Sequence, residues 1–394
     1  MAGTISRGVR APIIREGDDI VQIVVDSVLK AAAEDGFTLH TRDVIAVTEA
    51  VVARADGNYC TVDDISADVQ EKLGDTVSVV FPIMSRNRFA ICLRGIARGA
   101  KKVVVQLSYP ADEEGNHLID EDALLDAGVN PYADAFTEAE FVEKFGEPCH
   151  PFTGVNYLAY YRSLIEEEGA EAVILLANDP TAVLKYTSNV LVSNIHERER
   201  TARRLQKAGA ARVLTLCDIM NESRNGSGYQ SDYGLLGSNK ATENIIKLFP
   251  KNAREVAFAI QSEMLARTGV HVEAMVYGDG AFKDPVGKIW ELADPVVSPG
   301  FTDGLIGLPN ELKLKYLADN EFKALSGEEL TAAIRARIRE KERDLKGRMD
   351  SQGTTPRRLT DLIGSLCDLT SGSGDKGTPV VFIQGYFDNY AQEQ

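Results

Sequence analysis

The chain has 394 residues, 44% of them hydrophobic, and a formal net charge of -16 at pH 7. This length allows roughly two or three domains, and the negative charge argues against a nucleic acid or an anionic membrane as a partner. The five cysteines form no CxxC pair and the five histidines show no HExxH spacing, so neither a disulfide framework nor a zinc site is indicated. No run of about 18 apolar residues and no apolar leader occurs, so we expect a cytoplasmic protein.

The N-terminal part of the chain predicts alternating helices and buried strands. Asp19 precedes an apolar-periodic run that Gly36 ends, which is the pattern of a capped helix. The apolar run Asp43–Ala53 is short and bounded by charged residues, so it predicts a buried strand. The next two segments predict a helix over Arg86–Arg98 and a strand over Val103–Leu107.

The composition changes over residues 108–231, which begin with a polar, acidic segment. Within this region YLAYYRSLIEEEG leads to AVILLAND, and HERERTARRLQKAG leads to ARVLTLCD, so a helix and a buried strand alternate twice. This alternation favours a parallel α/β arrangement. We therefore expect an inserted α/β lobe over 108–231 and a core made of residues 1–107 and 232–394.

The C-terminal part returns to a mixture of helices and strands. Ala253–Arg267 has helical spacing, and Val270–Val276 alternates with the two-residue period of a strand. Ser326 and Glu329 form a capping-box pattern that predicts a long charged helix to about Gly347. A last strand is expected over 378–383. The whole pattern is that of an α+β or α/β protein.

The segment VYGDGAFKDP follows the strand that ends at Val276. Gly278 and Gly280 let the backbone approach a phosphate closely, and Asp279 between them could bind a hard cation such as Mg²⁺ or Mn²⁺. Lys283 is close enough in sequence to neutralise a phosphate oxygen. The alternative is a tight turn in which Asp279 only caps the next segment.

Two further segments carry candidate site residues. Asp303, in SPGFTDGLIG, could supply a second carboxylate for a divalent cation, or could be a turn aspartate. In GLLGSNKATEN, Ser238, Asn239 and Lys240 could contact a phosphate or a metal-bound water, or could cap a helix. Neither GxxxxGK[ST] nor a strand-following GxGxxG occurs, so a nucleotide would have to be held in another way.

The order of these segments resembles the coenzyme F420:L-glutamate ligase family, where F420 names a deazaflavin cofactor. The similar segments are GVRAPIIREGDDIVQIV, TRDVIAVTEAVVARADG, LFPKNAREVAFAIQSEMLARTGVHVEAMVYGDGAFKDP, FTDGLIG and DLIGSLCDLTSGSGDKGTPVVFIQGY. They cover roughly residues 8–100, 232–310 and 356–388. The resemblance implies a two-lobed ligase-like core of mixed sheets and helices, and it leaves 108–231 and 312–350 unexplained.

The resemblance also implies an activity. The family forms an amide with L-glutamate by using GTP to convert an acceptor carboxylate to an acyl phosphate, with Mg²⁺ or Mn²⁺ and with K⁺ as a further candidate cation. Asp279 looks like the metal-binding aspartate and Asp303 like the polar residue of the next loop. Ser238 and Asn239 resemble part of the metal and nucleotide loop. The family's members pair into homodimers.

This sequence departs from the family pattern near the expected site. Arg54, which could hold a carboxylate bidentately, stands where a lysine is usual. Ala50 replaces another lysine, no aspartate is evident near Leu236, and the aspartate loop continues as FKDPVGK. Two alternatives therefore stay open: the same ligase chemistry on another acceptor, such as a folate-like carboxylate, and a non-catalytic nucleotide- or ligand-binding protein on the same scaffold.

Overall fold

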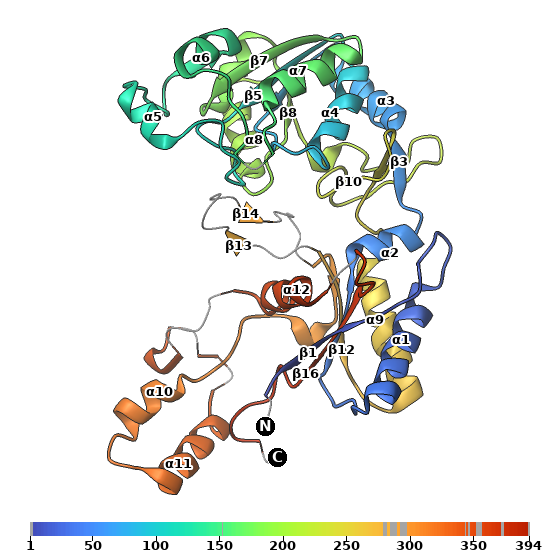
Figure 1. Ribbon diagram of the computed structural model, residues 1–394, viewed down its shortest axis with the longest axis vertical. Helices are drawn as coiled ribbons and strands as arrows, with labels where there is room; N and C mark the ends of the chain where they lie inside the picture. Colours follow the sequence, from blue (N-terminus) through green and yellow to red (C-terminus); the bar gives the residue numbers. More distant parts are fainter. Residues whose placement is uncertain are drawn as a thin grey trace.

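The computed structural model describes residues 3–151, 153–278, 298–342, 344–345, 347–351, 357–371 and 374–392, and the backbone of 282–283 and 290–291. The described chain forms a mixed α/β protein, which confirms the expected fold class. Two large sheets lie in separate lobes, and a small sheet lies where the lobes meet (Figure 1). None of the helices in these ranges has the length and apolarity that crossing a membrane requires.

The first lobe contains a five-stranded mixed sheet. The strand order is β1 (Ile5–Val9), β16 (Val380–Gln384), β2 (Val44–Thr48), β12 (Glu273–Tyr277) and β15 (Gly300–Phe301). The central neighbours β2 and β12 are parallel, and every other pair in the sheet is antiparallel. We call this part the five-stranded lobe.

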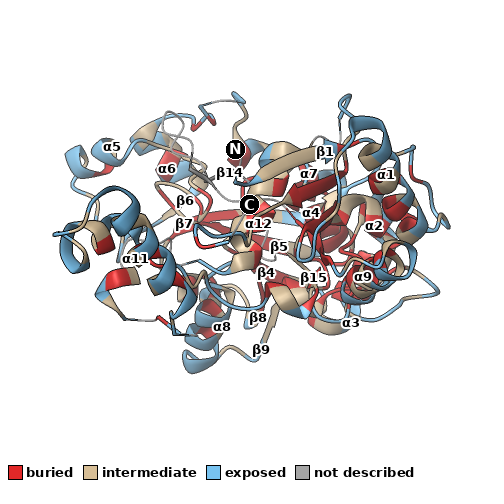
Figure 2. Cartoon of the chain, turned by 90° about the horizontal axis from the view of Figure 1, so that it is seen from below, coloured by how far each residue is buried: buried red, intermediate tan, exposed pale blue. Residues whose placement is uncertain are grey.

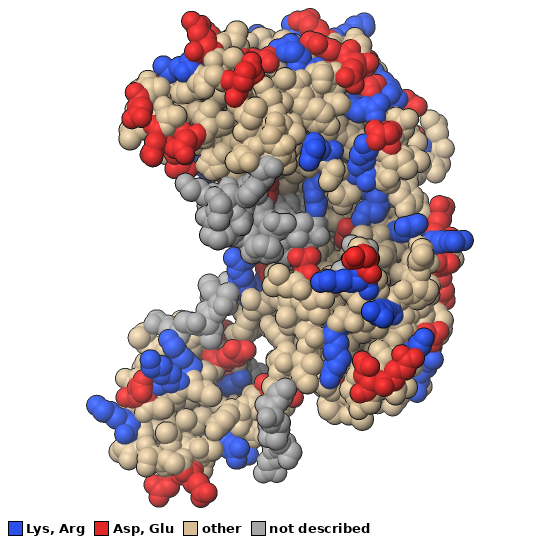
Figure 3. Space-filling model, in the orientation of Figure 1, with Lys and Arg blue, Asp and Glu red and all other residues tan. Residues whose placement is uncertain are grey.

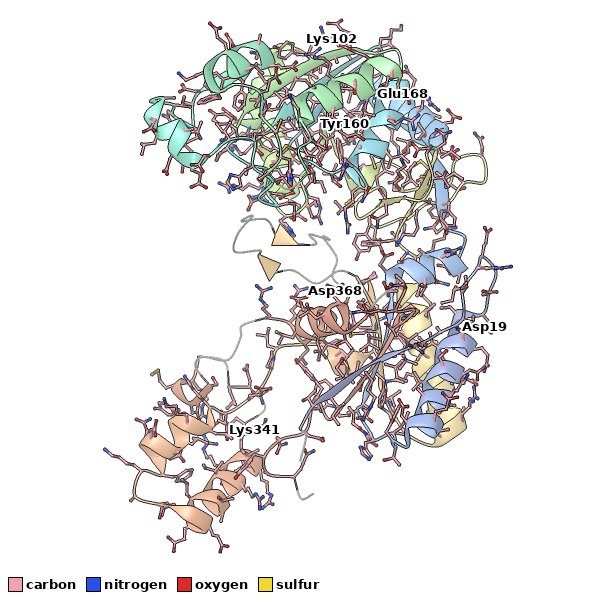
Figure 4. The ribbon with its side chains drawn as sticks, in the orientation of Figure 1. Asp19, Lys102, Tyr160, Glu168, Lys341 and Asp368 are labelled. Atoms are coloured by element: carbon pink, nitrogen blue, oxygen red, sulfur yellow. The ribbon has the colours of Figure 1, made fainter. Side chains whose placement is uncertain are left out.

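Helices cover both faces of this sheet. Apolar residues of α1 (Ile20–Asp35) and α9 (Ala253–Thr268) pack on one face, and those of α12 (Leu359–Thr370) pack on the other. Figure 2 shows the buried residues gathered along the strands and the inner sides of these helices. Asp19 and Asp368 therefore lie on opposite sides of the sheet (Figure 4). This packing holds the strand ends in fixed positions.

The second lobe contains a six-stranded sheet. Its order is β6 (Ala135–Thr137), β7 (Glu171–Ala177), β5 (Lys102–Leu107), β4 (Thr76–Val80), β8 (Asn189–Val192) and β9 (Arg212–Thr215). All neighbours are parallel except β6, which is antiparallel to β7. We call this part the six-stranded lobe.

Helices also cover both faces of the six-stranded sheet. One face carries α3 (Val62–Leu73), α4 (Phe89–Arg98) and α7 (Tyr157–Glu167), and the other carries η1 (Pro180–Lys185) and α8 (Arg198–Lys207). On the first face, Glu168 at the end of α7 forms ion pairs with Arg94 and Arg98 of α4, which link these two helices (Figure 4). Two short helices, α5 (Glu121–Asp126) and α6 (Glu138–Phe145), complete this lobe.

Shorter elements join and extend the two lobes. A three-stranded antiparallel sheet joins them, in the order β10 (Asn239–Lys240), β11 (Ile245–Lys247) and β3 (Tyr59–Thr61). A separate arm contains α10 (Leu314–Tyr316), the π-helix η4 (Leu317–Glu321) and α11 (Gly327–Arg339), with its own apolar cluster that includes Ala391. The remaining elements are α2 (Glu49–Ala55), η2 (Leu216–Asp218), β13 (Phe282–Lys283), β14 (Trp290–Glu291), η3 (Asp303–Leu305) and η5 (Met349–Ser351).

Three expectations from the sequence need correction. The strand predicted over Asp43–Ala53 ends at Thr48, and α2 begins at Glu49, because glutamate, alanine and arginine are strong helix formers. The helix predicted to reach Gly347 ends at Arg339, and the side chain of its N-cap residue makes no capping hydrogen bond. The expected boundary at residues 107 and 108 falls inside the six-stranded sheet, since β4 and β5 belong to that sheet.

Candidate active site

The candidate site lies at the edge of the five-stranded sheet that faces the six-stranded lobe (Figure 1). Thr48 and Tyr277, the last residues of the parallel strands β2 and β12, are register partners at this edge. Gly278 follows one strand and Glu49 follows the other. The strand β16 begins here too, where the Thr48 N–H donates to the Pro379 carbonyl oxygen at 3.0 Å. Ligands of α/β sheets bind at carboxyl ends of parallel strands, so this edge is suited to hold one.

A buried ion pair connects this edge to the small sheet between the lobes. The Lys247 ammonium on β11 donates to both carboxylate oxygens of Glu49, at 2.9 and 3.0 Å. The two side chains are only 12% and 6% exposed. At this low exposure little water screens the two opposite charges, so their attraction is stronger than that of a surface pair. The pair therefore fixes the small sheet against the end of β2.

Asn239 reaches the same region through its strand register. It lies directly opposite Lys247 in the antiparallel pair of β10 and β11. Residues that face each other in such a pair have their side chains on the same face of the sheet. Asn239 therefore shares the face from which Lys247 reaches Glu49. Of the three candidates in GLLGSNKATEN, Asn239 is the one that lies opposite Lys247, the residue that binds Glu49 at the end of β2.

The two neighbours of Asn239 have other surroundings. Ser238 is buried, and its hydroxyl lies 3.4 Å from the Cys92 thiol on α4. Burial raises the pKa of Cys92 to about 11, and the hydrogen bond with Ser238 opposes part of that shift. The Lys240 ammonium is paired with Glu243 at the surface. The structure thus brings neither side chain to Gly278.

Arg54 occupies the last turn of α2 and is exposed. Burial raises the pKa of the Tyr59 phenol, and the positive charge of Arg54 opposes this shift. Tyr59 is in turn the register partner of Lys247 on the other side of β11. Arg54 therefore lies beside the small sheet that joins the lobes. It stands at the C-terminal end of α2, whereas Glu49 is the first residue of this helix.

Asp303 lies toward the opposite end of β12. The strand β15 runs antiparallel to β12 with Phe301 opposite Met275, so the chain carries Asp303 back toward Glu273. Four residues of strand separate Glu273 from Tyr277, which is roughly 13 Å at about 3.3 Å per residue. The Asp303 carboxylate accepts from Arg254 at 3.2 Å in an exposed ion pair. The structure does not bring Asp303 beside Gly278.

The glycines on either side of Asp303 are required for packing. A Cβ on Gly304 would lie 1.9 Å from a carboxylate oxygen of Glu273, and a Cβ on Gly300 would lie 2.2 Å from the backbone of Ala253. Both distances are far below van der Waals contact. These glycines thus reflect the close approach of β15 to α9 and of η3 to β12.

Several predicted site residues lie outside the described residues. These are Asp279, Gly280 and the side chain of Lys283, whose backbone belongs to β13. In the described ranges, no three His, Cys, Asp or Glu side chains lie close enough together to hold a metal ion. The oxygen donors that the sequence places next to Gly278 suit Mg²⁺ or Mn²⁺, because hard cations prefer carboxylate and amide oxygens.

Glu49 and Lys247 are not among the site residues predicted from the sequence. Both stand in apolar surroundings, in the runs DVIAVTEAVVA and IIKLF. A charged residue within an apolar run is a usable signal, since burial of a charge is costly unless a partner is present. The partner itself could not be identified, because 198 positions separate the two residues.

Three comparisons place the chain among known proteins. A protein-family model described as F420-0:Gamma-glutamyl ligase matches residues 8–385. No curated protein matches the sequence. Among solved structures, the biosynthetic arginine decarboxylase from Campylobacter jejuni is 9% identical, with 93% of this chain and 67% of that chain covered and a TM-score of 0.13.

Proposed function

Because the chain belongs to the F420-0:gamma-glutamyl ligase family, whose members are NTP-dependent amide-forming ligases, we propose that it uses GTP to join L-glutamate to a carboxylate acceptor, a coenzyme F420 precursor. The observation that carries this proposal is the family match, which extends over residues 8–385 and so includes both lobes. The geometry adds support, since two parallel strands, a buried ion pair and the start of the Gly278 loop meet at one edge.

The chemistry explains why a nucleotide is needed. A carboxylate is a poor electrophile at neutral pH, and its conversion to an acyl phosphate supplies a leaving group that the glutamate amine can displace. The phosphoryl group and its acceptor are both negative, so charge neutralisation dominates such a transfer. A divalent cation bound by Asp279 would supply part of that neutralisation.

This chain's own residues have distinct roles in the proposal. Asp279 follows Gly278 and so starts from the edge where β2 and β12 end. Lys283 provides a positive charge for a phosphate oxygen, and Arg54 binds a carboxylate. Glu49 holds Lys247 at the same edge, which keeps an ammonium group and the neighbouring Asn239 in fixed positions for the nucleotide.

The surface supports a site at the junction of the lobes. Figure 3 shows a hollow between the six-stranded lobe and the α10–α11 arm, and several Lys and Arg side chains lie on this face near the line where the two lobes meet. The Lys and Arg side chains near the junction (Figure 3) favour a triphosphate there even in a chain whose net charge is -16.

The acceptor remains the more open part of the proposal. The six-stranded sheet stands over the strand ends, so its loops help to set which acceptor can enter. A folate-like carboxylate is the second candidate. The family also makes a homodimer the expected assembly, which light scattering of the purified protein would test.

Glutamate-dependent release of GDP tests the function directly. The purified protein is incubated with GTP, Mg²⁺ or Mn²⁺ and L-glutamate, with a coenzyme F420 precursor, a folate or no acceptor. Turnover with the first acceptor alone supports the proposal, and turnover with the folate alone changes the acceptor. If GTP raises the melting temperature but no acceptor gives GDP, the protein is a nucleotide-binding protein and the ligase assignment fails.

A further inference from the structure

A second cavity lies at the carboxyl edge of the six-stranded sheet. The chain passes from β4 outward to β5 and β7, and then returns to β8 and β9 on the other side of β4. The order therefore reverses between β4 and β8. In open α/β sheets, ligands bind in the crevice outside the strand ends at such a reversal.

Side-chain hydrogen bonds hold the four loops at this edge together. Asp112, in the loop after β5, accepts from the Met84 N–H after β4 at 2.7 Å. Glu113 of the same loop accepts from the His196 N–H after β8 at 3.0 Å. Asn178, which follows β7, exchanges two hydrogen bonds with the backbone of the β5 loop. The rim is thus built as a connected unit, which favours a preformed site.

The loops line an open cavity of about 300 Å³ beside α8. Phe81, the residue after β4, lines it and has a φ of 55°. A bulky aromatic residue in the left-handed region is strained, and such strain is concentrated at ligand sites and active sites. The backbone N–H of Phe81 is fixed by the Gln106 carbonyl oxygen at 2.9 Å.

The cavity contains a buried polar group that has an unused end. The Asn194 side chain lines it, is 3% exposed, and donates from its amide nitrogen to the Thr201 hydroxyl at 3.2 Å. Its amide oxygen has no hydrogen-bond partner among the described residues. If the oxygen and nitrogen of the amide exchange places, the oxygen accepts from Thr201 and the amide nitrogen is the atom without a partner. A buried polar end of this kind needs a partner.

A second unused oxygen lies below the same edge. Gln106 is one residue before the end of β5 and is fully buried. Its amide nitrogen donates to the carbonyl oxygens of Ala177 and Asp179, both at 2.8 Å, while its amide oxygen has no partner within the described part of the chain. Gln106 does not line the cavity, so of the two unused amide oxygens only that of Asn194 belongs to a residue of the proposed site.

Charged residues of both signs line the cavity, the acids Asp112, Glu113 and Glu197 and two arginines. Arg200 and Arg204 of α8 both line it and are 73% and 48% exposed. Each is paired with an acid at the surface, Arg200 with Glu197 at 3.0 Å and Arg204 with Asp179 at 3.2 Å. A guanidinium group can exchange an exposed partner for a ligand carboxylate at little cost, and it binds carboxylates bidentately.

We propose that this cavity is a binding site for a small α-amino or α-hydroxy acid, separate from the ligase site. The ligand carboxylate contacts the two arginines, and its ammonium or hydroxyl group donates to the buried amide of Asn194. A volume of about 300 Å³ lies at the lower end of the range of about 300–1,000 Å³ that is usual for small-molecule pockets, which suits a small acid. The proposal does not depend on the ligase function.

The test measures binding of three probes to the full-length protein by isothermal titration calorimetry and thermal shift. The probes are L-glutamate, L-malate and inorganic phosphate, which separate the amino acid, the hydroxy acid and a simple anion. The main variant is Arg200→Gln combined with Arg204→Gln, and Arg203→Gln on the same helix is the matched control. Asn194→Ser removes the amide.

We expect L-glutamate or L-malate to bind, and the double arginine variant to weaken its Kd by at least about tenfold, because one or two charged hydrogen bonds are lost. Arg203→Gln should bind as the unmodified protein does. Absence of binding by both organic acids overturns the proposal, as does binding of phosphate alone. Binding that is equal in the double variant and in Arg203→Gln also overturns it, because the ligand then occupies another site.

Discussion

Lys247 and Glu49 form a buried ion pair across the junction of the two lobes, with 198 positions of sequence between them. One residue belongs to the small sheet that joins the lobes, and the other follows the central strand β2. Removal of Glu49 would take away a carboxylate that compensates the Lys247 ammonium at low exposure.

Glu49→Gln should therefore be strongly destabilising. Loss of one partner of a buried pair costs about 3–5 kcal/mol of unfolding free energy, which urea denaturation measures. Lys240→Met is the control, since it breaks an exposed pair with Glu243 and should cost only about 0–1 kcal/mol. Equal losses in the two variants would show that the Glu49 pair contributes no more than a surface pair.

The same pair offers a test that separates stability from activity. The double variant Glu49→Leu with Lys247→Met replaces both charges by apolar groups, so we expect stability to recover toward that of the unmodified protein. If Lys247 contributes to nucleotide binding, GDP release should stay low in this stable variant. Full activity in a stable double variant would limit the pair to a structural role.

Asp279→Asn should lower metal-dependent turnover by at least about 10–100-fold, as losses around metal sites commonly do, with little change in unfolding temperature. Asp303→Asn is the informative companion, because its carboxylate is paired with Arg254 near the amino end of β12. If both aspartates hold one metal, the two variants should show the same rise in the Mg²⁺ concentration required for half-maximal turnover. An effect of Asp279→Asn alone places the metal at the carboxyl end of β12.

Asp112 should make stability depend on pH in mildly acidic solution. Burial raises the pKa of this carboxyl from its ordinary 3.8 to about 6, although four hydrogen bonds oppose the shift. Between these two values the folded protein keeps a proton that the unfolded chain has released, so stability falls as pH rises through this window and is level above it. A shift of this size corresponds to about 3 kcal/mol.

The measurement compares urea unfolding of the protein and of Asp112→Asn at several values of pH from 4 to 7. The stability of the unmodified protein relative to the variant should fall as the pH rises from about 4 to 6 and then stay constant. Parallel stability curves for the two proteins would mean that Asp112 keeps the same pKa in the folded and unfolded states.

Gly300→Ala should destabilise the protein through overpacking alone. The added methyl group would lie 2.2 Å from backbone atoms of Ala253, which cannot move as a side chain could, so we expect a loss of about 1–3 kcal/mol or more. Gly374→Ala is the control, because nothing lies within 4 Å of the position of its Cβ. Calorimetric melting of both variants checks this, and an unchanged melting temperature for Gly300→Ala would contradict it.

Features that depend on local sequence could be predicted. Asp19 caps α1 by accepting from the Gln22 N–H at 3.0 Å, and Gly36 ends the helix in the left-handed conformation. Both signals lie within a few residues of the element that they define. The run Asp43–Ala53 was ambiguous because a short apolar segment fits a strand and a buried helix equally well, and the chain changes from one to the other at Glu49.

Features that depend on distant contacts could not be predicted. The placement of Asp303 follows from the register of β15 against β12. The sequence shows only the glycines, not the helix α9 and the strand β12 against which they pack. The strand β4 was also missed, although it is the strand from which the order of the six-stranded sheet reverses. The candidate site was thus predictable as a loop after β12, but its neighbours Glu49 and Lys247 required the fold.

The small sheet between the lobes limits how they can move. The chain passes between the lobes twice, through β3 and through β11, and these two strands are hydrogen-bonded to each other, with Ile246 opposite Cys60. A single covalent link would let one lobe swivel freely, whereas a bonded ribbon resists torsion and bends across its flat face. Bending about one axis is therefore the relative motion of the lobes that this connection permits.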